Sequence, residues 1–332
     1  NPLSVTGIWY SPDGHSLEYS FDEESGLKRL DEAVAFIQEY DGAYDGRIHG
    51  ILAPTQTMTC TPDILKKVRQ KADALGVGIT IHGSESMMEF ESCLRMFGKT
   101  PVQFMAEHGM VGSDVVVGHC YLIQGHSNIH MYGDDDIRIL SESGTTVAHC
   151  PNVLARGGNS LQSFARYRDA GVNVGLGTDT FPCDYMLEMR QAAYMGKLMA
   201  KSTFAVTAKD VFQAATINGA KALNRSDLGR LAPGAKADFV VFKLDSIEMS
   251  PVRDVVKNIV YSATRHSVDS VYIDGKCIVK HGKMNGIDEE ALACELQELA
   301  EAAWLQAPEH DRFARTVNEL SPLSAPLYEG EF

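Results

Sequence analysis

Three histidines and two carboxylates of this sequence occupy positions that suit metal-dependent hydrolysis. Short apolar runs end in His82 (after GVGITI), His119 (after VVVG), His149 (after TTVA) and Asp179 (after VGLGT), and Glu85 follows His82 by three residues. Imidazole nitrogens and carboxylates bind divalent metals such as zinc and iron. A carboxylate beside a metal-activated water can act as a general base, and a second carboxyl can donate a proton. The residue types therefore predict a metal, a base and an acid at one site.

Each of these residues also has an ordinary structural role open to it. A single histidine at the end of a strand is more often a hydrogen-bonded structural residue than a metal ligand, and Asp179 could cap the helix that follows it. The order of the four strand-end residues favours the functional interpretation, because the carboxyl ends of successive parallel strands meet at one edge.

The elements that must position these residues are strands alternating with amphipathic helices. Strands are predicted at residues 5–10, 46–53, 77–82, 114–119, 145–149 and 172–178. The first helix is predicted at 27–40, and a second begins at Pro62 after a Thr61 cap and runs to Leu75, where Gly76 ends it. Six consecutive βα units predict an α/β protein with a parallel sheet, and a (β/α)8 TIM-barrel type of fold with its active site at the strand ends.

The sequence changes character near residue 226. A turn at Pro233-Gly234 leads into a predicted strand at 238–244, and VYIDGKCIV predicts a hairpin turning at Asp274-Gly275. A final helix is predicted at 287–305, followed by an irregular tail. We therefore expect a partial barrel at 1–225, strands of a small β-sandwich with a last barrel-packing helix at 226–285, and a C-terminal helix and tail at 286–332.

The composition limits the partners that we expect. The 332 residues carry 30 Lys and Arg against 44 Asp and Glu, a net charge of −14, which argues against nucleic acid. Seven scattered cysteines without a C-x-x-C pair indicate a reducing compartment. No apolar run approaches the ~20 residues that span a bilayer, so we expect no membrane partner and a cytoplasmic protein.

Five motifs in a fixed order resemble a known family. H-x-x-E at His82 and Glu85, GHC at His119, VAHCP at His149, GLGTD at Asp179, and then DLGRLAPGAKADFVVF resemble the amidohydrolase superfamily. The likeness runs from about residue 52 to 284 and is strongest to the cytosine deaminase-like aminohydrolases and chlorohydrolases with one metal.

The resemblance implies a role for each residue. It makes His82 the strand-five metal ligand, Glu85 the proton shuttle, and His119 the strand-six group that polarises water or substrate. It makes Asp179, at the end of strand eight, both metal ligand and general base. The resemblance also implies that Glu85, His119 and His149 contact a small nitrogen-heterocycle substrate, which Gln56 could reach from the loop after strand four. We add Phe181 as an expected substrate contact. The loop that holds Phe181 departs from the pattern of the heterocycle deaminases, and Gln56 could instead be part of a turn.

Two absences from the family pattern shape the metal expectation. The strand-one H-x-H motif is missing from the sequence, so residues 5–10 and 46–53 would be strands three and four of a barrel lacking its first two βα units. We expect an N-terminally incomplete fragment, or alternatively a native short form, that binds zinc or iron weakly or not at all. Strand four has no lysine to bridge two metals, which predicts a mononuclear site in the complete protein.

Two classes of function remain open. The first is a hydrolase of non-peptide carbon–nitrogen bonds, with deamination of a purine, pyrimidine or triazine-like ring ahead of amide hydrolysis or dehalogenation. The alternative is a metal-free, truncated barrel that binds a small ligand or a partner. Exposed edges of the outer strands would favour self-association into a homo-oligomer. In the loop after His119, His126 and His130 are expected to be solvated.

Overall fold

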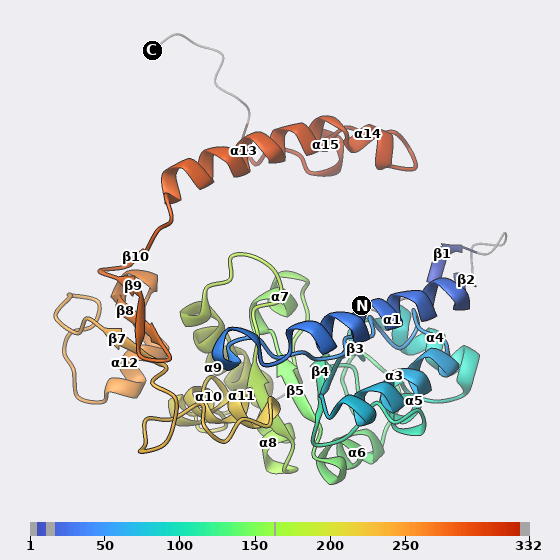
Figure 1. The fold of residues 1–332 in the computed structure, drawn as a ribbon, viewed down its shortest axis with the longest axis horizontal. Helices are drawn as coiled ribbons and strands as arrows, with labels where there is room; N and C mark the ends of the chain where they lie inside the picture. Colours follow the sequence, from blue (N-terminus) through green and yellow to red (C-terminus); the bar gives the residue numbers. More distant parts are fainter. Residues whose placement is uncertain (1–4, 11–16, 163, 326–332) are drawn as a thin grey trace.

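The computed structural model describes residues 5–10, 17–162 and 164–325 (Figure 1). Its centre is a parallel sheet of four strands in the order β3-β4-β5-β6. These strands are β3 (Ile79–Gly83), β4 (Val115–His119), β5 (Thr146–His149) and β6 (Asn173–Leu176). The four predicted strands from residue 77 onward are confirmed, each slightly shorter than predicted. Their β-branched residues suit a sheet that is covered on both faces.

Helices follow the strands and enclose the sheet (Figure 1). They are α1 (Glu23–Tyr40), α2 (Ala43–Gly46), α3 (Pro62–Leu75), α4 (Met87–Phe97), α5 (Pro101–Glu107), α6 (Asp135–Ser143), α7 (Pro151–Arg156), α8 (Phe164–Asp169), α9 (Tyr185–Ala200), α10 (Ala208–Ala214) and α11 (Ile217–Ala222). The start of α3 is as predicted, because the Thr61 side chain accepts the Ile64 amide and Gly76 ends the helix at φ 68°. Apolar side chains of these helices and of the sheet form one buried core.

The first two predicted strands do not form βα units. Strand β1 (Val5–Tyr10) pairs antiparallel with β2 (Leu17–Phe21) in a separate two-stranded sheet. Residues 46–53 form no regular strand, although Leu52 and Gln56 make isolated parallel bridges to β3. The segment therefore lies where a neighbouring strand would lie, but a left-handed turn before it and Pro54, which lacks an amide hydrogen, interrupt regular pairing.

The C-terminal part contains an antiparallel sheet in the order β10-β9-β8-β7. Its strands are β7 (Phe239–Phe242), β8 (Val268–Ile273), β9 (Lys276–Lys280) and β10 (Lys283–Met284). The hairpin turn at Asp274 and Gly275 is confirmed, with φ of 51° and 76°. Helix α12 (Val255–Tyr261) packs against α9 and α10. A β-sandwich was predicted here, and in this part of the chain the described residues form one antiparallel sheet.

A long helix stands away from the body of the molecule (Figure 1). Helix α13 (Glu289–Leu305) confirms the prediction at 287–305 and buries none of its residues. The tail was predicted to be irregular, and this is wrong in part, because α14 (Ala307–His310) and α15 (Val317–Leu320) form there. Capping explains α15, since Thr316 and Glu319 satisfy each other's backbone amides.

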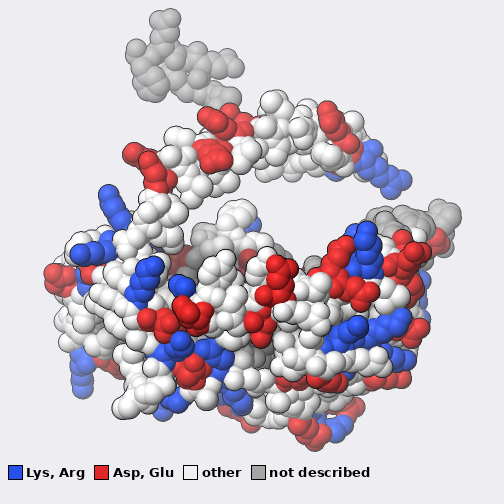
Figure 2. Space-filling model, viewed as in Figure 1, with Lys and Arg blue, Asp and Glu red and all other residues white. Residues whose placement is uncertain are grey.

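The surface and the helices give two further observations. Acidic and basic side chains are interspersed over the face in Figure 2, in keeping with the absence of a basic run in the sequence. Among the described residues, no helix combines the length and the apolar character needed to cross a bilayer.

Candidate active site

The ends of β3 and β4 bring two histidines together. Gly83 pairs with His119 in the parallel register, so His82 lies beside the end of β4. The two imidazole rings stack with centroids 5.7 Å apart and planes 18° apart. This juxtaposition follows from the parallel topology, as the sequence predicted.

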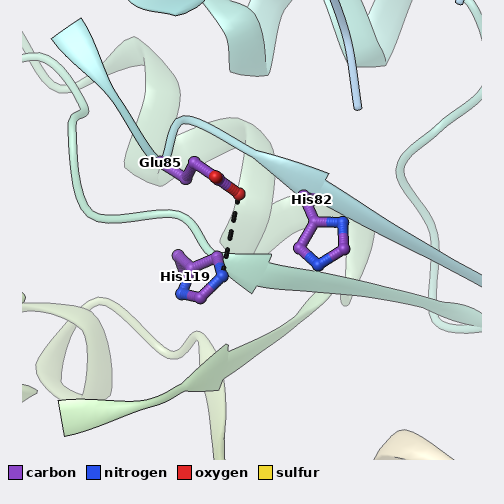
Figure 3. Close-up of side chains that lie close together, drawn as sticks. All are labelled: His82, Glu85 and His119. Carbon is purple, nitrogen blue, oxygen red and sulfur yellow. Dashed lines mark ion pairs between the residues drawn. The ribbon is translucent and has the colours of Figure 1, made fainter. Parts of the chain in front are cut away.

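Three side chains form a cluster that could hold a metal ion. His82, Glu85 and His119 each offer one ligand atom, and these atoms all lie within 4.8 Å of one another (Figure 3). Asp179, beyond the end of β6, approaches the cluster through His119, whose Nε2 lies 3.7 Å from Asp179 Oδ2 and 3.7 Å from Glu85 Oε2. These separations are longer than a hydrogen bond, so the groups do not hydrogen-bond one another directly and stay close enough to bind one metal ion together.

The partners of the cluster's nitrogens and oxygens fit a divalent metal. His82 Nδ1 lies 2.8 Å from the Thr55 carbonyl oxygen, which can only accept, so Nδ1 donates and Nε2 is left with its lone pair for a metal. Glu85 Oε2 and His119 Nδ1 are buried without a hydrogen-bond partner among the described residues. Buried polar atoms without partners are rare and call for an additional ligand.

Burial favours the neutral form of two histidines at the strand ends, His119 and His149. It lowers the pKa of His119, and the nearby Glu85 and Asp179 carboxylates only partly oppose the shift. Burial also lowers the pKa of His149 to about 3. A neutral imidazole can bind a metal or donate one hydrogen bond, whereas an imidazolium cannot bind a metal.

The backbone at the strand ends adopts left-handed conformations. Ser84, His119, Cys120 and Asp179 have φ of 55°, 64°, 45° and 57°. Hydrogen bonds between the two turns hold them, because the Ser84 carbonyl accepts the amides of Tyr121 (3.1 Å) and of the residue after it (3.0 Å). Non-glycine residues adopt this region at a cost and cluster at functional sites.

A buried tyrosine supports the turn at His119. The Tyr167 hydroxyl donates to the Cys120 carbonyl at 2.7 Å. We expect Tyr167→Phe to lower the free energy of unfolding by about 1–3 kcal/mol, because the carbonyl loses its buried donor. Urea denaturation measures this. Tyr185→Phe is the comparison, because the hydroxyl of half-buried Tyr185 donates to the Leu176 carbonyl at 3.1 Å. Its loss should lower the free energy of unfolding less than the loss of the buried Tyr167 hydroxyl. Equal stability of Tyr167→Phe and the unmodified protein would contradict the expectation.

The other predicted site residues lie around the cluster rather than in it. His149 ends β5 and is 3% exposed, with no hydrogen-bond partner for Nδ1 among the described residues. Gln56 bridges to His82 through the backbone. Phe181 is 73% exposed, and Arg156 holds it with a guanidinium 4.8 Å from the ring centroid and a 2.9 Å hydrogen bond to its carbonyl.

The loop after His119 corrects one expectation. His126 was expected to be solvated, but it is 3% exposed, and its Nε2 lies 3.2 Å from the Ser160 carbonyl oxygen. His130 is exposed, as expected. The loop sequence is polar, and the hydrogen-bond partner of His126 lies 34 positions further along the chain. The local sequence therefore gives no sign that His126 is buried.

Comparison with known proteins decides the family. The profile of the amidohydrolase family matches residues 3–278. The chain belongs to this family. The resemblance of the ordered strand-end motifs to amidohydrolases is thereby confirmed, and the cluster at β3 and β4 lies within the matched region.

Two curated amidohydrolase relatives are deaminases. The chain is 34% identical over 280 residues to a 5-methylthioadenosine/S-adenosylhomocysteine deaminase of Desulfitobacterium hafniense, covering 83% of this chain and 63% of that protein. It is 33% identical over 293 residues to a 5'-deoxyadenosine deaminase of Methanosarcina barkeri, covering 86% and 65%. The chain thus spans less than two thirds of the length of these relatives.

Solved structures of similar fold include an adenosine deaminase from Xanthomonas campestris with bound zinc, with a TM-score of 0.76 and 24% identity over 86% of this chain and 63% of that one. An atrazine chlorohydrolase from Arthrobacter aurescens complexed with zinc has a TM-score of 0.74 and 19% identity, covering 89% and 64%. With the family match, these likenesses show an α/β fold of the TIM-barrel type.

Proposed function

We propose that this protein is a metal-dependent aminohydrolase that replaces the exocyclic amino group of an adenosine-type nucleoside with oxygen. The observation that carries the proposal is the convergence of His82, Glu85, His119 and Asp179 at the ends of parallel strands. The adenine-nucleoside deaminases among the relatives support the substrate class.

His82 and Asp179 would hold the divalent metal, with His119 and Glu85 within reach of it. When bound, such a metal lowers the pKa of a coordinated water towards neutrality and polarises the bond under attack. Zinc fits the nitrogen and oxygen donors, and iron fits the same set. A catalytic zinc site normally has three protein ligands. His82 and Asp179 supply two, so we propose that this chain binds the metal weakly.

The side chains then divide the proton transfers. Asp179 accepts a proton from the attacking water, and Glu85 donates one to the ring nitrogen next to the reacting carbon. His119 donates a hydrogen bond to the oxygen of the attacking water and orients it towards the reacting carbon, while the charge that develops on the ring nitrogen is neutralised by the proton from Glu85. The proton held by Asp179 then moves to the amino group, which leaves as ammonia, and the proton that remains on the new hydroxyl group returns to Glu85 as the 6-oxo product forms.

The architecture that we propose assigns β3–β6 to strands five to eight of a (β/α)8 barrel. In it, residues 1–225 belong to a partial barrel, 226–285 supply β-sandwich strands and α12, and 286–332 form the C-terminal helix and tail. Gln56, His149 and Phe181 would line the substrate pocket around the cluster. The exposed Phe181 ring offers a stacking surface for a purine. We also propose a cytoplasmic location, since all seven cysteines are free thiols. A homo-oligomer is proposed because exposed strand edges favour self-association.

A substrate panel tests the function. The purified protein with added zinc is incubated with adenosine, 5'-methylthioadenosine, 5'-deoxyadenosine and S-adenosylhomocysteine, and with cytosine and atrazine as representatives of other rings. We expect ammonia and the 6-oxopurine product from one or more of the adenine nucleosides, followed by ultraviolet absorbance. Zinc-dependent turnover of atrazine alone, or no ammonia from any nucleoside, would contradict the proposal.

A further inference from the structure

A buried carboxylate lies directly behind the candidate active site. Glu89, in the first turn of α4, has no exposed surface and forms no ion pair with any described residue. The Thr57 hydroxyl donates to its Oε1, and the Glu85 amide donates to its Oε2 at 2.8 Å. Burial raises the pKa of Glu89 to about 7, although both hydrogen bonds oppose the shift. Burying a carboxylate costs folding free energy unless hydrogen bonds compensate for the lost water. The two hydrogen bonds of Glu89 therefore call for an explanation.

Helix capping does not account for this arrangement. Ser86 already caps α4, because its hydroxyl accepts the Glu89 amide at 3.1 Å. In a capping box the glutamate would accept the amide of the cap residue itself. Glu89 instead accepts the amide of Glu85, one residue earlier, and is held by Thr57 from outside the helix.

The amide that donates to Glu89 belongs to Glu85, the proposed proton donor, in the turn that follows β3. Ser84 before it has φ of 55°, a conformation that an L-residue does not keep without support. After it, the Glu85 carboxylate reaches to 3.7 Å from His119 Nε2. We propose that Glu89, held by Thr57, is a positioning residue that fixes the backbone of Glu85 and thereby directs its carboxyl group to the reacting atoms. This inference rests on the proposed role of Glu85 as proton donor.

Three variants test the positioning. Glu89→Met removes the acceptor, whereas Glu89→Gln keeps an amide oxygen for the Glu85 amide and lets the Thr57 hydroxyl act as acceptor. Thr57→Val removes the second support and is the variant to use if Glu89→Met does not fold. Hydrogen exchange of the Glu85 amide, followed by mass spectrometry, should quicken in Glu89→Met and Thr57→Val and stay unchanged in Glu89→Gln.

Kinetics with the best nucleoside provide the second measurement. For Glu89→Met we expect kcat to fall about 10- to 100-fold, the usual effect of a lost supporting contact, with little change in KM. Glu89→Gln should retain kcat close to that of the unmodified protein. Equal losses in the two Glu89 variants, or unchanged exchange and kcat in Glu89→Met, would overturn the proposal.

Asp136 provides a matched control. It too is fully buried, and its carboxylate accepts the Thr100 hydroxyl at 2.5 Å and the Gln124 amide at 2.9 Å. Asp136→Leu should lower the melting temperature as Glu89→Met does, but leave exchange at Glu85 unchanged; faster exchange there would show general loosening and overturn the proposal. If the unmodified protein deaminates no nucleoside, the proposed function fails, while the exchange measurement still decides whether Glu89 fixes the turn.

Discussion

Asp179→Asn is expected to abolish turnover, with kcat reduced about 10²- to 10⁴-fold by loss of the general base alone. The amide cannot accept a proton from water and is a poorer metal ligand than the carboxylate. Asp179 lies at φ 57°, a region that asparagine tolerates well, so the fold should be at least as stable as before. Steady-state kinetics with added zinc, together with a thermal melt, measure both effects.

Asp184→Asn is the control for this change. Asp184 lies five residues later and caps α9 by accepting the amides of Met186 and Leu187 at 3.0 and 3.1 Å. Asparagine and aspartate are equally good caps, so this variant should keep both stability and kcat. Retained full activity in Asp179→Asn would rule out Asp179 as the general base.

Glu85→Gln should give a loss of similar size, about 10²- to 10⁴-fold in kcat, for a different reason. Glutamine matches the shape of glutamic acid but cannot donate a proton to the ring nitrogen. KM should change little, because the same contacts remain. The loss should be of similar size with a 6-chloropurine nucleoside, because the ring nitrogen must be protonated whichever group leaves.

Glu91→Gln serves as the matched control, because Glu91 is exposed on α4, the helix that follows Glu85, and is not a member of the cluster. Its kinetics should match those of the unmodified protein for both substrates. If Glu85→Gln lost much less activity with the chloro than with the amino nucleoside, Glu85 would protonate the leaving group and not the ring nitrogen.

The sequence predicted the part of the fold that depends on local pattern. The β-branched runs at β3 to β6 are short, apolar and followed by helices, so their parallel pairing follows from chain connectivity. Residues 5–10 form the predicted strand, but they pair with an antiparallel neighbour outside the parallel sheet. The apolar pattern of a strand does not indicate which strand lies beside it. Residues 46–53 have the apolar pattern of a strand without its regular hydrogen bonds.

The site was predictable only where chemistry lies at strand ends. His82, His119 and Asp179 could be placed together because parallel strands end at one edge. Glu89 and Tyr167 could not, since in sequence they are ordinary helix residues. Their importance comes from one hydrogen bond each to a backbone group at the site, and such a bond leaves no periodic signal.

The left-handed backbone at Ser84, His119 and Asp179 has a consequence for attempts to engineer the protein. Each such residue costs about 1–3 kcal/mol relative to a relaxed backbone, and glycine or asparagine would relieve part of this. A library selected for heat resistance alone would therefore enrich substitutions at these three codons. Variants with substitutions at His119 or Asp179 would be thermostable but inactive, an instance of the trade-off between stability and activity. Heat selection should keep these codons fixed or be coupled to a screen for ammonia release.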